Sequence, residues 1–468
     1  MAYCHLLDAV FGHTEPLRSR VVTKNLKLSV HGAGYLGAIH ATCMAHLGHE
    51  VKVYDVDPAK IAMLAQGTSP FYEPGFDELL GATQATGRLQ FTNSAQEAIQ
   101  GAEMHFICVG TPQQPGCDAA DLSYLDSAFQ TILNHADRTG TIVGKSTVPV
   151  GTAQRLADSI PSDAGNFDLK IAWNPEFLRE GNAIEDTLAP DRLVFGIDSA
   201  ASETKLLRAY DSLVAAGVPF ITTDLATSEM VKVAANSFLA TKISFINAMA
   251  EICEVANADV VTLSRALGYD ERIGAQFLNA GLGFGGGCLP KDIRAFSARA
   301  GELGAADAVS FLREIDKINL RRRERMVSLV GSIFGGDFLG KNIAVLGAAF
   351  KPNSDDVRDS PALNVAAAMH LRGATVRVHD PKAIENARKM FPTLTYCDYA
   401  DDACLNADLI VLATEWDEYR NIDPRKFISI VRQPILVDGR NALDHKSWSE
   451  AGWTVYALGR GHLRAIAK

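Results

Sequence analysis

The stretch LKLSVHGAGYLGAIHATCMAHLGHEVKVYD, residues 26–55, decides the fold. Its apolar start at 26–30 predicts a buried strand that leads directly into a glycine-rich turn. The glycines of that turn have the spacing GxGxxG: Gly32, Gly34 and Gly37. A helical pattern at 39–47 and a second apolar run at 51–54 complete a strand–helix–strand unit, which is typical of dinucleotide-binding domains.

The residue types in this unit suit a dinucleotide. Glycines allow backbone amides to approach a pyrophosphate at a helix N-terminus. Asp55 follows the second apolar run, where a carboxylate accepts the hydroxyls of the adenosine ribose. Because a carboxylate at that place would repel the 2′-phosphate of NADP, the sequence favours NAD.

Two further apolar runs predict parallel strands at 104–109 and 141–145, each followed by a turn that contains glycine, proline and threonine. Ligands of an open parallel sheet lie beyond the carboxyl ends of its strands, so both turns should face the cofactor. Thr111 and Thr147 in these turns could instead cap the next helices, and that role stays open. The segment NPEFLREG, residues 174–181, adds two carboxylates, an amide and an arginine as candidate site groups.

A second glycine-rich stretch, FLNAGLGFGGGCLPKD at 277–292, contains one cysteine, Cys288. Dense glycines let a loop wrap closely around a ligand. A thiol with cationic neighbours ionises below its usual pKa and becomes a nucleophile. The alternative is a flexible linker with an inert thiol, but linkers are usually polar between their glycines, whereas this loop is apolar and aromatic.

The segment 224–256 has no proline or glycine and predicts one helix of roughly 30 residues, long enough to connect two domains. Lys232 and Asn236 are four residues apart and therefore share a face of this helix. A lysine on a surface helix is usually only solvated, and that alternative remains open for Lys232.

The last third of the chain predicts a second α/β domain. Apolar runs mark its expected strands at 342–346, 374–379, 409–413 and 435–438. The first turn of this domain lacks GxGxxG, which argues against a second dinucleotide. Lys351, Arg358 and Arg440 follow expected strands and supply the cations that a substrate phosphate requires.

The composition limits the classes of protein and partner. The 468-residue chain has a formal net charge of -10, which argues against a nucleic-acid partner. No apolar run approaches the ~18 residues of a membrane helix. The eight cysteines have no CxxC spacing, which fits reduced thiols in a cytoplasmic protein and gives no recognisable metal site.

These patterns predict three parts behind an N-terminal extension. The extension, 1–25, lacks the apolar core of a secretion signal and is expected to be poorly ordered. The expected parts are a dinucleotide-binding domain at 26–222, a central helical region with the thiol loop at 223–325, and a substrate-binding α/β domain at 326–468.

These segments closely resemble the UDP-glucose 6-dehydrogenase family of sugar-nucleotide dehydrogenases, from Leu28 to about Leu443. The motifs that carry the resemblance are GAGYLG from Gly32, KSTVPVGT from Lys145, NPEFLREG from Asn174, the pair Lys232 and Asn236, GFGGGCLPKD from Gly283 and GAAFKPNSDDVRDS from Gly347. The resemblance implies an α/β fold of two Rossmann-like doubly wound domains, joined by a long central helix that also builds a homodimer interface. It implies NAD in the N-terminal domain and the UDP of the substrate in the C-terminal one.

The activity that the resemblance implies is a four-electron oxidation of UDP-glucose to UDP-glucuronate, with two NAD+ used in succession. Cys288 would form a thiohemiacetal and then a thioester, which water hydrolyses. Lys232 and Asn236 would stabilise the oxyanions of these steps. Asp292 would act as acid or base through a water that Thr147 helps to hold.

The resemblance also implies a role in thioester hydrolysis for Glu176, and contacts to both ligands. The implied cofactor contacts are Gly32, Gly34, Tyr35, Leu36, Gly37, Asp55, Lys60, Val109, Gly110, Thr111, Thr147, Glu180 and Arg358. The implied substrate contacts are Glu176, Phe177, Leu178, Arg179, Lys232, Asn236, Arg272, Phe277, Leu278, Asn279, Gly283, Gly285, Phe350, Lys351 and Arg440. Arg272 is implied to reach across the dimer into the other subunit's site.

Three alternatives stay open. A GDP-mannose 6-dehydrogenase shares the thiol loop and the mechanism, although the segments 280–284 and 148–152 look more like those of the UDP-glucose branch. A hydroxyacid dehydrogenase of similar architecture performs one oxidation and needs no cysteine. A non-enzymatic domain that senses NAD has no use for the combination of a thiol, a lysine, an asparagine and an aspartate.

Overall fold

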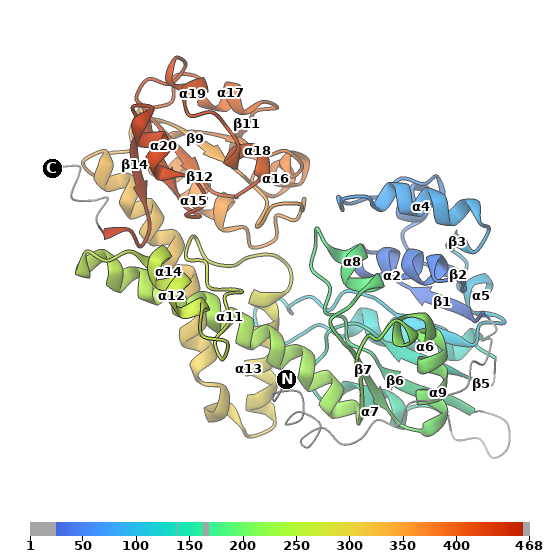
Figure 1. Ribbon diagram of the computed structural model, residues 1–468. Coiled ribbons are helices and arrows are strands. Elements are labelled where there is room, and N and C mark those ends of the chain that lie inside the picture. The colour runs from blue at the N-terminus through green and yellow to red at the C-terminus, as the bar shows by residue number, and fades with distance from the viewer. Residues whose placement is uncertain (1–24, 138, 162–167, 462–468) are drawn as a thin grey trace.

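The computed structural model describes residues 25–137, 139–161 and 168–461. Two sheets lie at opposite ends of the molecule, and a group of long helices lies between them (Figure 1). The expected N-terminal extension, 1–25, lies outside the described residues except for Asn25. No helix in the described ranges is long and apolar enough to cross a membrane.

The first sheet has eight strands in the order β3-β2-β1-β4-β5-β6-β7-β8. Its strands are β1 (Lys27–His31), β2 (Glu50–Tyr54), β3 (Leu89–Thr92), β4 (Met104–Ile107), β5 (Thr139–Gly144), β6 (Asp168–Trp173), β7 (Leu193–Ile197) and β8 (Phe220–Thr223). Neighbouring strands are parallel except β6 and β7, which are antiparallel. The strand order reverses at β1, so the carboxyl ends of β1 and β4 form the switch point where open sheets bind ligands.

Helices cover both faces of the first sheet, which makes this domain doubly wound (Figure 1). They are α2 (Tyr35–His46), α3 (Pro58–Ala65), α4 (Phe76–Ala85), α5 (Ala95–Ile99), α6 (Ser123–His135), α7 (Thr152–Asp158), α8 (Ala183–Leu188), α9 (Ala200–Ala209) and α10 (Asp211–Ala215). One apolar core includes residues of α2, α4, α8 and α9. A second core, with α5, α6 and α7, lies on the other face.

The middle of the chain is helical. Its elements are α11 (Leu225–Ala256), α12 (Val260–Gly268), α13 (Leu289–Glu302), the 3-10 helix η1 (Ala306–Val309) and α14 (Phe311–Ile333). Helix α11 has 32 residues, as the sequence predicted, and both α13 and α14 pack against it. The Asp224 side chain caps its start by accepting the N–H of Thr227 at 2.7 Å, and Asn257 ends it in the left-handed conformation, φ 55°.

One apolar stripe of α11 is uncovered in the single chain. Phe238, Phe245 and Ile252 are seven residues apart and are 66%, 47% and 55% exposed. We call these three residues the α11 stripe. Large apolar side chains in one exposed row mark an interaction surface rather than a solvated helix face.

The second sheet has six strands, all parallel, in the order β11-β10-β9-β12-β13-β14. Its strands are β9 (Asn342–Leu346), β10 (Thr375–His379), β11 (Thr395–Tyr396), β12 (Leu409–Leu412), β13 (Ile435–Asp438) and β14 (Thr454–Ala457). Its helices are α15 (Pro361–Leu371), α16 (Ile384–Met390), α17 (Ala400–Cys404), α18 (Asp417–Arg420), α19 (Arg425–Ile428) and α20 (His445–Glu450). Two Rossmann-like domains joined by α11 confirm the predicted fold class (Figure 1).

The proposed boundary between residues 325 and 326 falls inside α14. Met326, Val327 and Val330, in the second half of that helix, belong to the apolar core of the second sheet. This packing supports a domain that begins near residue 326, while the helix continues across the boundary. The domain boundaries remain a proposal.

The turn after the first strand is built in the same way in both domains. The N–H of Gly32 donates to the carbonyl of Tyr54, and that of Gly347 to the carbonyl of His379, both at 2.8 Å. The next residue donates its N–H to an aspartate at the end of the second strand: Ala33 to Asp55 and Ala348 to Asp380, both at 2.7 Å. The two domains therefore share one architecture down to this turn.

Two neighbouring histidines, His31 and His105, are buried inside the first domain. Ser29 Oγ lies 3.1 Å from His31 Nε2 and 2.7 Å from His105 Nδ1. Burial, reinforced by the neighbouring ring of His105, lowers the pKa of His31 to about 3. Burial also lowers the pKa of His105 to about 4. Both rings are therefore neutral in the folded protein at pH 5, where they would be protonated in the unfolded chain.

We expect the double variant His31→Leu, His105→Leu to lose less stability on acidification than the wild type. The unfolded chain takes up a proton at each histidine below about pH 6.5 and the folded chain does not, so each costs up to about 2 kcal/mol of stability at pH 5. Urea unfolding at pH 7 and pH 5 measures the difference. Because carboxyl groups titrate in the same range, the comparison between wild type and variant isolates the histidines. The exposed His135, replaced by glutamine, is the control; equal pH sensitivity of wild type and double variant would contradict the prediction.

Candidate active site

The turn after β1 is shaped for close approach of a ligand. Gly32 has φ 98°, a conformation that other residues rarely adopt. A Cβ on Gly37 would lie 1.8 Å from the carbonyl oxygen of Gly32, so the helix can approach the strand only if residue 37 is glycine. Gly34, at the N-terminus of α2, has open space on its Cβ side. Backbone amides beside open space are what a pyrophosphate requires.

Asp55 is oriented by this turn. Its Oδ2 accepts the N–H of Ala33 at 2.7 Å, and its Oδ1 accepts the N–H of Asp57 at 2.9 Å. Lys60 Nζ lies 3.3 Å from the same carboxylate. The predicted carboxylate thus lies at the end of β2 beside the glycine turn, where it fits the ribose of NAD.

The turns after β4 and β5 are tied together. Thr111 donates its hydroxyl to the carbonyl of Thr147 at 2.7 Å, and Ser146 donates to the carbonyl of Val109 at 2.7 Å. Gly110 between them is exposed, with open space beside its Cα. The structure therefore brings the predicted cofactor residues of these two turns to one place. Thr111 is not used as a helix cap here, because its hydroxyl joins the two turns.

The thiol loop, residues 277–292, is held in one conformation by buried side chains. Asn247 of α11 accepts the N–H of Gly281 at 2.9 Å. Asn319 of α14 accepts the N–H of Phe284 at 2.7 Å and donates to its carbonyl at 3.0 Å. A Cβ on Gly283 would lie 2.3 Å from Asn319 Oδ1. The loop is therefore closely packed, and a flexible linker is excluded.

Cys288 stands at the N-terminus of α13, and solvent reaches it. Burial nevertheless raises the pKa of the thiol to about 12, and the carboxylates of Glu176 and Asp292 add to the shift. The cations of Lys232 and Lys291 oppose it. In this state of the protein Cys288 is a neutral thiol at pH 7 and needs a base or a bound cation to become a nucleophile.

Lys232 and Glu176 form an ion pair in which Nζ and Oε1 are 2.9 Å apart. Lys232 is 5% exposed. Burial lowers its pKa, but the carboxylate of Glu176, together with Cys288 and Asp292, raises it above the usual value. The same ammonium lies 5.6 Å from the ring centre of Phe177. Lys232 is therefore a buried cation of the site, and a solvated surface role is excluded.

Asp292 is 2% exposed and is held by two donors. Asn236 Nδ2 donates to its Oδ2 at 2.6 Å, and Lys291 Nζ to its Oδ1 at 2.6 Å. Because α11 carries Asn236 and α13 carries Asp292, this contact fixes the two helices where the thiol loop ends. The predicted set Cys288, Lys232, Asn236, Asp292 and Glu176 is thus brought together by contacts or direct charge interactions.

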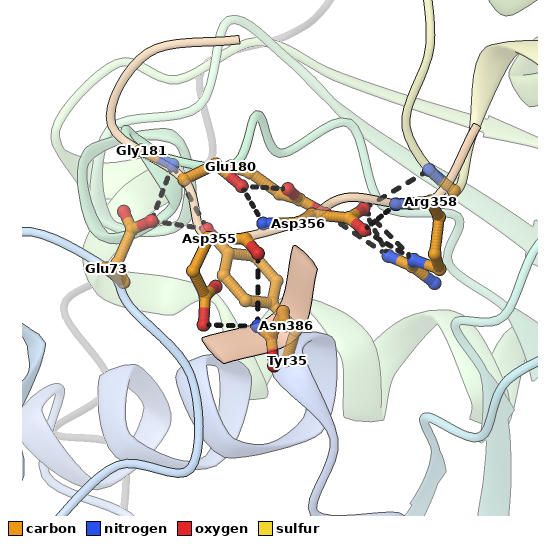
Figure 2. A network of polar contacts seen from close by, with 10 residues as sticks. Tyr35, Glu73, Glu180, Gly181, Asp355, Asp356, Arg358 and Asn386 are labelled. Atoms are coloured by element: carbon orange, nitrogen blue, oxygen red, sulfur yellow. Dashed lines mark hydrogen bonds and ion pairs between the residues drawn. The ribbon is translucent and has the colours of Figure 1, made fainter. Parts of the chain in front are cut away.

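The two domains meet at a network of polar contacts, which Figure 2 shows. Ser354 of the second domain donates to Glu180 of the first at 2.7 Å. Arg358 forms a fork with Asp356, with Nη2 to Oδ2 at 2.7 Å, and lies 3.5 Å from Glu180. Burial and the charge of Asp356 raise the pKa of Glu180 to about 7. Gly287 donates its N–H to Asp356 at 3.3 Å, so this network extends to the residue before Cys288.

The cations that were predicted to bind a substrate phosphate differ in the contacts that they already make within the protein. The guanidinium of Arg440 donates to the carbonyls of Ala413, Gly283 and Phe350 at 2.7, 3.1 and 3.0 Å. Arg440 therefore holds the thiol loop against two turns of the second domain. Lys351 lies 5.5 Å from the ring centre of Phe350, and burial lowers its pKa. In the described part of the chain Lys351 makes no ion pair, so its ammonium is available to bind a phosphate.

Other predicted residues serve the packing or the surface of the single chain. Arg272 is paired with Asp270 at 2.6 Å, and its side chain is 89% exposed. Arg179 forms a fork with Asp186, at 2.6 Å for the closest atoms. Asn279 is exposed. These three residues do not join the buried set around Cys288.

The remaining predicted residues pack in the first domain or determine the shape of the thiol loop. Leu36 and Leu178 pack against the core of the first domain. Leu278 is buried under α12, and Phe277 before it has φ 63°, which bends the loop there. A Cβ on Gly285 would lie 2.4 Å from the carbonyl oxygen of Asp359. These residues fix the shape of the loop, and a direct contact to substrate stays a prediction for them.

The second domain cannot bind a ribose as the first does. Asp380, the counterpart of Asp55, accepts the N–H groups of Ala348 and Ala349 and the indole of Trp416 at 2.7, 3.0 and 3.1 Å. Its other oxygen accepts the N–H groups of Lys382 and Ala383. Since five donors already occupy this carboxylate, none of its lone pairs is left for a ribose. The geometry agrees with the missing GxGxxG.

The sequence reasoning missed several residues that support the site. They are Glu73, Asn247, Lys291, Asn319 and Asp356. Glu73 accepts the N–H of Gly181 at 2.5 Å and that of Ala183 at 2.7 Å, and it also accepts the hydroxyl of Tyr35 (Figure 2). The signal was weak, because a single glutamate or asparagine between apolar residues has no distinctive spacing. Lys291 could have been found, since it lies between Cys288 and Asp292 in the sequence.

Comparisons with known proteins agree with this geometry. Residues 26–214 match the family model described as the UDP-glucose/GDP-mannose dehydrogenase family, NAD binding domain. Residues 226–321 match the central domain of the same family, and residues 344–445 match its UDP binding domain. The chain is similar to the UDP-glucose 6-dehydrogenase of Rickettsia conorii, at 41% identity over 93% of this chain and 99% of that protein.

Solved structures are similar as well. The UDP-glucose dehydrogenase of Pyrobaculum islandicum has a TM-score of 0.85 and 36% identity, and the match covers 96% of this chain and 100% of that chain. A ternary complex of GDP-mannose dehydrogenase from Pseudomonas aeruginosa has a TM-score of 0.51 and 28% identity, over 90% of this chain and 98% of that chain.

Proposed function

The chain belongs to the UDP-glucose/GDP-mannose dehydrogenase family, with NAD as its cofactor, and from this premise we propose that it oxidises UDP-glucose to UDP-glucuronate. The oxidation would remove four electrons in two steps, through a thiohemiacetal and a thioester on Cys288. The observation that carries the proposal is the buried set around the thiol, in which the ion pair Lys232–Glu176 and the pair Asn236–Asp292 meet at one loop.

Each residue of this set has a task in the proposed sequence. When bound, NAD+ accepts one hydride in each oxidation. Asp292, through a water, would take the proton of the C6 hydroxyl as the aldehyde forms. The Cys288 sulfur would then add to the aldehyde carbon while its proton passes to the aldehyde oxygen, which gives the thiohemiacetal. Loss of this hydroxyl proton to Asp292 and of the second hydride would give the thioester. Lys232 and Asn236 donate to the oxygen on which negative charge develops, an effect of roughly 3 kcal/mol per donor. Water, assisted by Glu176, would then cleave the C–S bond of the thioester, which gives the carboxylate and returns the thiol.

A small cavity supports the role proposed for Thr147 and Asp292. Both residues line a cavity of ≈ 10 Å³, together with Val233, Lys291 and Arg299. This volume corresponds to about one water molecule. A water there would lie beside both Asp292 and Thr147. This arrangement supports proton transfer through a water.

UDP-glucose is proposed over GDP-mannose because of the relatives. The Rickettsia conorii UDP-glucose 6-dehydrogenase is 41% identical, and the Pyrobaculum islandicum UDP-glucose dehydrogenase structure matches at 36% identity with a TM-score of 0.85. The GDP-mannose dehydrogenase structure matches at 28% identity with a TM-score of 0.51. GDP-mannose 6-dehydrogenase remains the second candidate, with the same thiol chemistry.

The seven described cysteines are all free, which supports the proposed cytoplasmic location.

The decisive experiment counts NADH formed per sugar nucleotide consumed, with purified protein, excess NAD+ and either UDP-glucose or GDP-mannose. Two NADH per UDP-glucose is the expected result. Two NADH per GDP-mannose would keep the mechanism and change the substrate. One NADH per sugar would refute the covalent route, because the aldehyde would then be the product.

The active site is proposed to be shared between two subunits of a homodimer. The uncovered α11 stripe supports such an interface, since it is the kind of apolar surface that a second copy covers. Arg272 is exposed in the single chain, which supports a role toward another subunit. Among the described residues Asp270 is the one ion-pair partner of Arg272, which leaves further N–H donors of the guanidinium available for a substrate.

We expect Arg272→Ala to raise the KM for UDP-glucose about tenfold, the loss of one charged hydrogen bond, with the KM for NAD+ unchanged. Steady-state kinetics measures both values. Arg420→Ala is the matched control, because Arg420 is also exposed and paired with an aspartate nearby, Asp417. Mixing Arg272→Ala with Cys288→Ser subunits should restore activity at low substrate, because a mixed dimer regains one complete site. A mixture no more active than Arg272→Ala alone would refute the shared site.

A further inference from the structure

Three buried polar residues follow one face of α11, at positions 229, 232 and 236. Their spacing of three and four residues places them in a row along the helix. Lys232 contacts Glu176, and Asn236 contacts Asp292. Glu229, the first of the row, has no assigned role, and it contacts the segment that follows Thr147.

The contacts of Glu229 are short and complete. Oε2 accepts the N–H of Gly151 at 2.7 Å, and Oε1 accepts the N–H of Ala153 at 2.6 Å. Glu229 is 2% exposed. Helix α7 begins at Thr152 without a side-chain cap of its own, so Glu229 caps it from another helix. A buried carboxylate that accepts two backbone N–H groups in this way fixes the position of the segment that donates them.

Arg299 holds the same segment from its carbonyl side. Its Nε donates to the carbonyl of Val150 at 2.8 Å. Arg299 belongs to α13, which also carries Asp292, and its charge stabilises the ionised form of Glu229. Burial of Glu229 raises the pKa of its carboxyl to about 7, against the effect of these donors. The segment from Thr147 to Gly151 is thus fixed between α11 and α13.

The position of this segment decides the shape of the cavity between Thr147 and Asp292. Thr147, Val148, Pro149 and Val150 supply one part of the cavity lining. Val233 of α11 and several residues of α13 supply most of the remainder: Lys291, Asp292, Ala295, Phe296 and Arg299. The cavity has room for about one water, so a shift of the wall by about 1 Å would change whether a water can bridge the two sides.

We propose that Glu229 is a positioning residue for the proton-transfer step. It fixes the 147–151 wall so that Thr147 faces Asp292 across the cavity. This inference rests on the proposed function, in which Asp292 works through a water in that cavity. Glu229 acts through Thr147 and does not itself touch the substrate.

The test is the variant Glu229→Gln, which keeps the size of the side chain and removes the charge that binds two N–H groups. We expect kcat to fall at least tenfold while the KM for UDP-glucose changes less than threefold. The matched control is Glu254→Gln on the same helix, since Glu254 is also buried, accepts the N–H of Gly459 at 2.9 Å and pairs with Arg325. The control should lose similar thermal stability and keep kcat within twofold. An unchanged kcat in Glu229→Gln, or the same loss in both variants, would overturn the proposal.

A double variant tests the route through Thr147. If Glu229 acts by placing Thr147, adding Glu229→Gln to Thr147→Ala should cost less than threefold in kcat, although it costs at least tenfold in the wild type. Losses that multiply would overturn the route. Should Glu229→Gln fail to fold, Arg299→Lys loosens the same wall from its carbonyl side and should give the same pattern.

The outcome is separable from that of the proposed function. Wild-type protein in the same assays reports NADH per sugar nucleotide, and this number tests the function alone. The ratio of kcat between Glu229→Gln and Glu254→Gln tests the positioning role with whichever sugar nucleotide the wild type oxidises.

Discussion

Replacing Cys288 with serine should lower the steady-state formation of UDP-glucuronate by at least about 10³-fold. The hydroxyl of serine is far less nucleophilic than sulfur and does not form a thioester, so the second oxidation loses its covalent intermediate. Binding of NAD+ should persist, because the glycine turn after β1 and Asp55 are distant from residue 288 along the chain. In the described structure they make no contact with the thiol. Product analysis and titration of NAD+ binding by fluorescence measure the two expectations.

Cys117 supplies the control for this variant. It is a second exposed free thiol and lies on a loop of the first domain, where its sulfur contacts Gln114 at 3.3 Å. Cys117→Ser should retain full activity. Normal formation of the acid by Cys288→Ser would disprove covalent catalysis by this residue. Loss of NAD+ binding in the same variant would show that the thiol loop also supports the cofactor domain.

The second large effect is expected from Lys232→Ala. The change removes the ammonium that is 2.9 Å from Glu176 and leaves this carboxylate, which is 13% exposed, without its cation. Breaking a buried ion pair from one side costs about 3 kcal/mol of stability. Loss of an oxyanion donor in the same place should lower kcat by about 10²- to 10³-fold. Thermal unfolding and steady-state kinetics measure the two losses.

Removing both partners separates the two effects. In Lys232→Ala, Glu176→Gln no unpaired carboxylate remains, so most of the lost stability should return while kcat stays low. Lys170→Ala is the surface control, because Lys170 and Asp168 form an ion pair of the same length whose side chains are 37% and 67% exposed. A normal kcat in Lys232→Ala would show that Lys232 only maintains the fold.

Much of the fold was predictable because its signals are local. The residues of β1, the glycines after it and Asp55 lie within one short stretch of sequence, and the role of each depends on the local backbone conformation. Helix α11 was predicted almost to its last residue, since Asp224 caps its start and no proline or glycine interrupts it. The family resemblance, the fold class and NAD as the cofactor are confirmed.

The site was predicted less completely, because some of its contacts cross the molecule. Asn319 and Phe284 are 35 residues apart, and Glu229 and Gly151 are 78 apart, so neither pair has a sequence spacing that marks it. The exposure of the α11 stripe was also not predictable, since apolar periodicity does not reveal which apolar face the same chain covers. Motif reasoning finds residues that act on ligands, and it overlooks those that hold the motifs in place.

The hydrogen bonds that hold the thiol loop have a consequence for the order in which the protein folds. The loop is fixed at Gly281 by Asn247, at Phe284 by Asn319 and, across 157 residues of chain, at Gly283 by Arg440. During synthesis the loop therefore leaves the ribosome long before its last partner exists. The first domain can fold around its own cores and complete its glycine turn while residue 440 is still untranslated. Such distant contacts form late, so the nascent chain gains a finished cofactor turn well before it gains a working nucleophile.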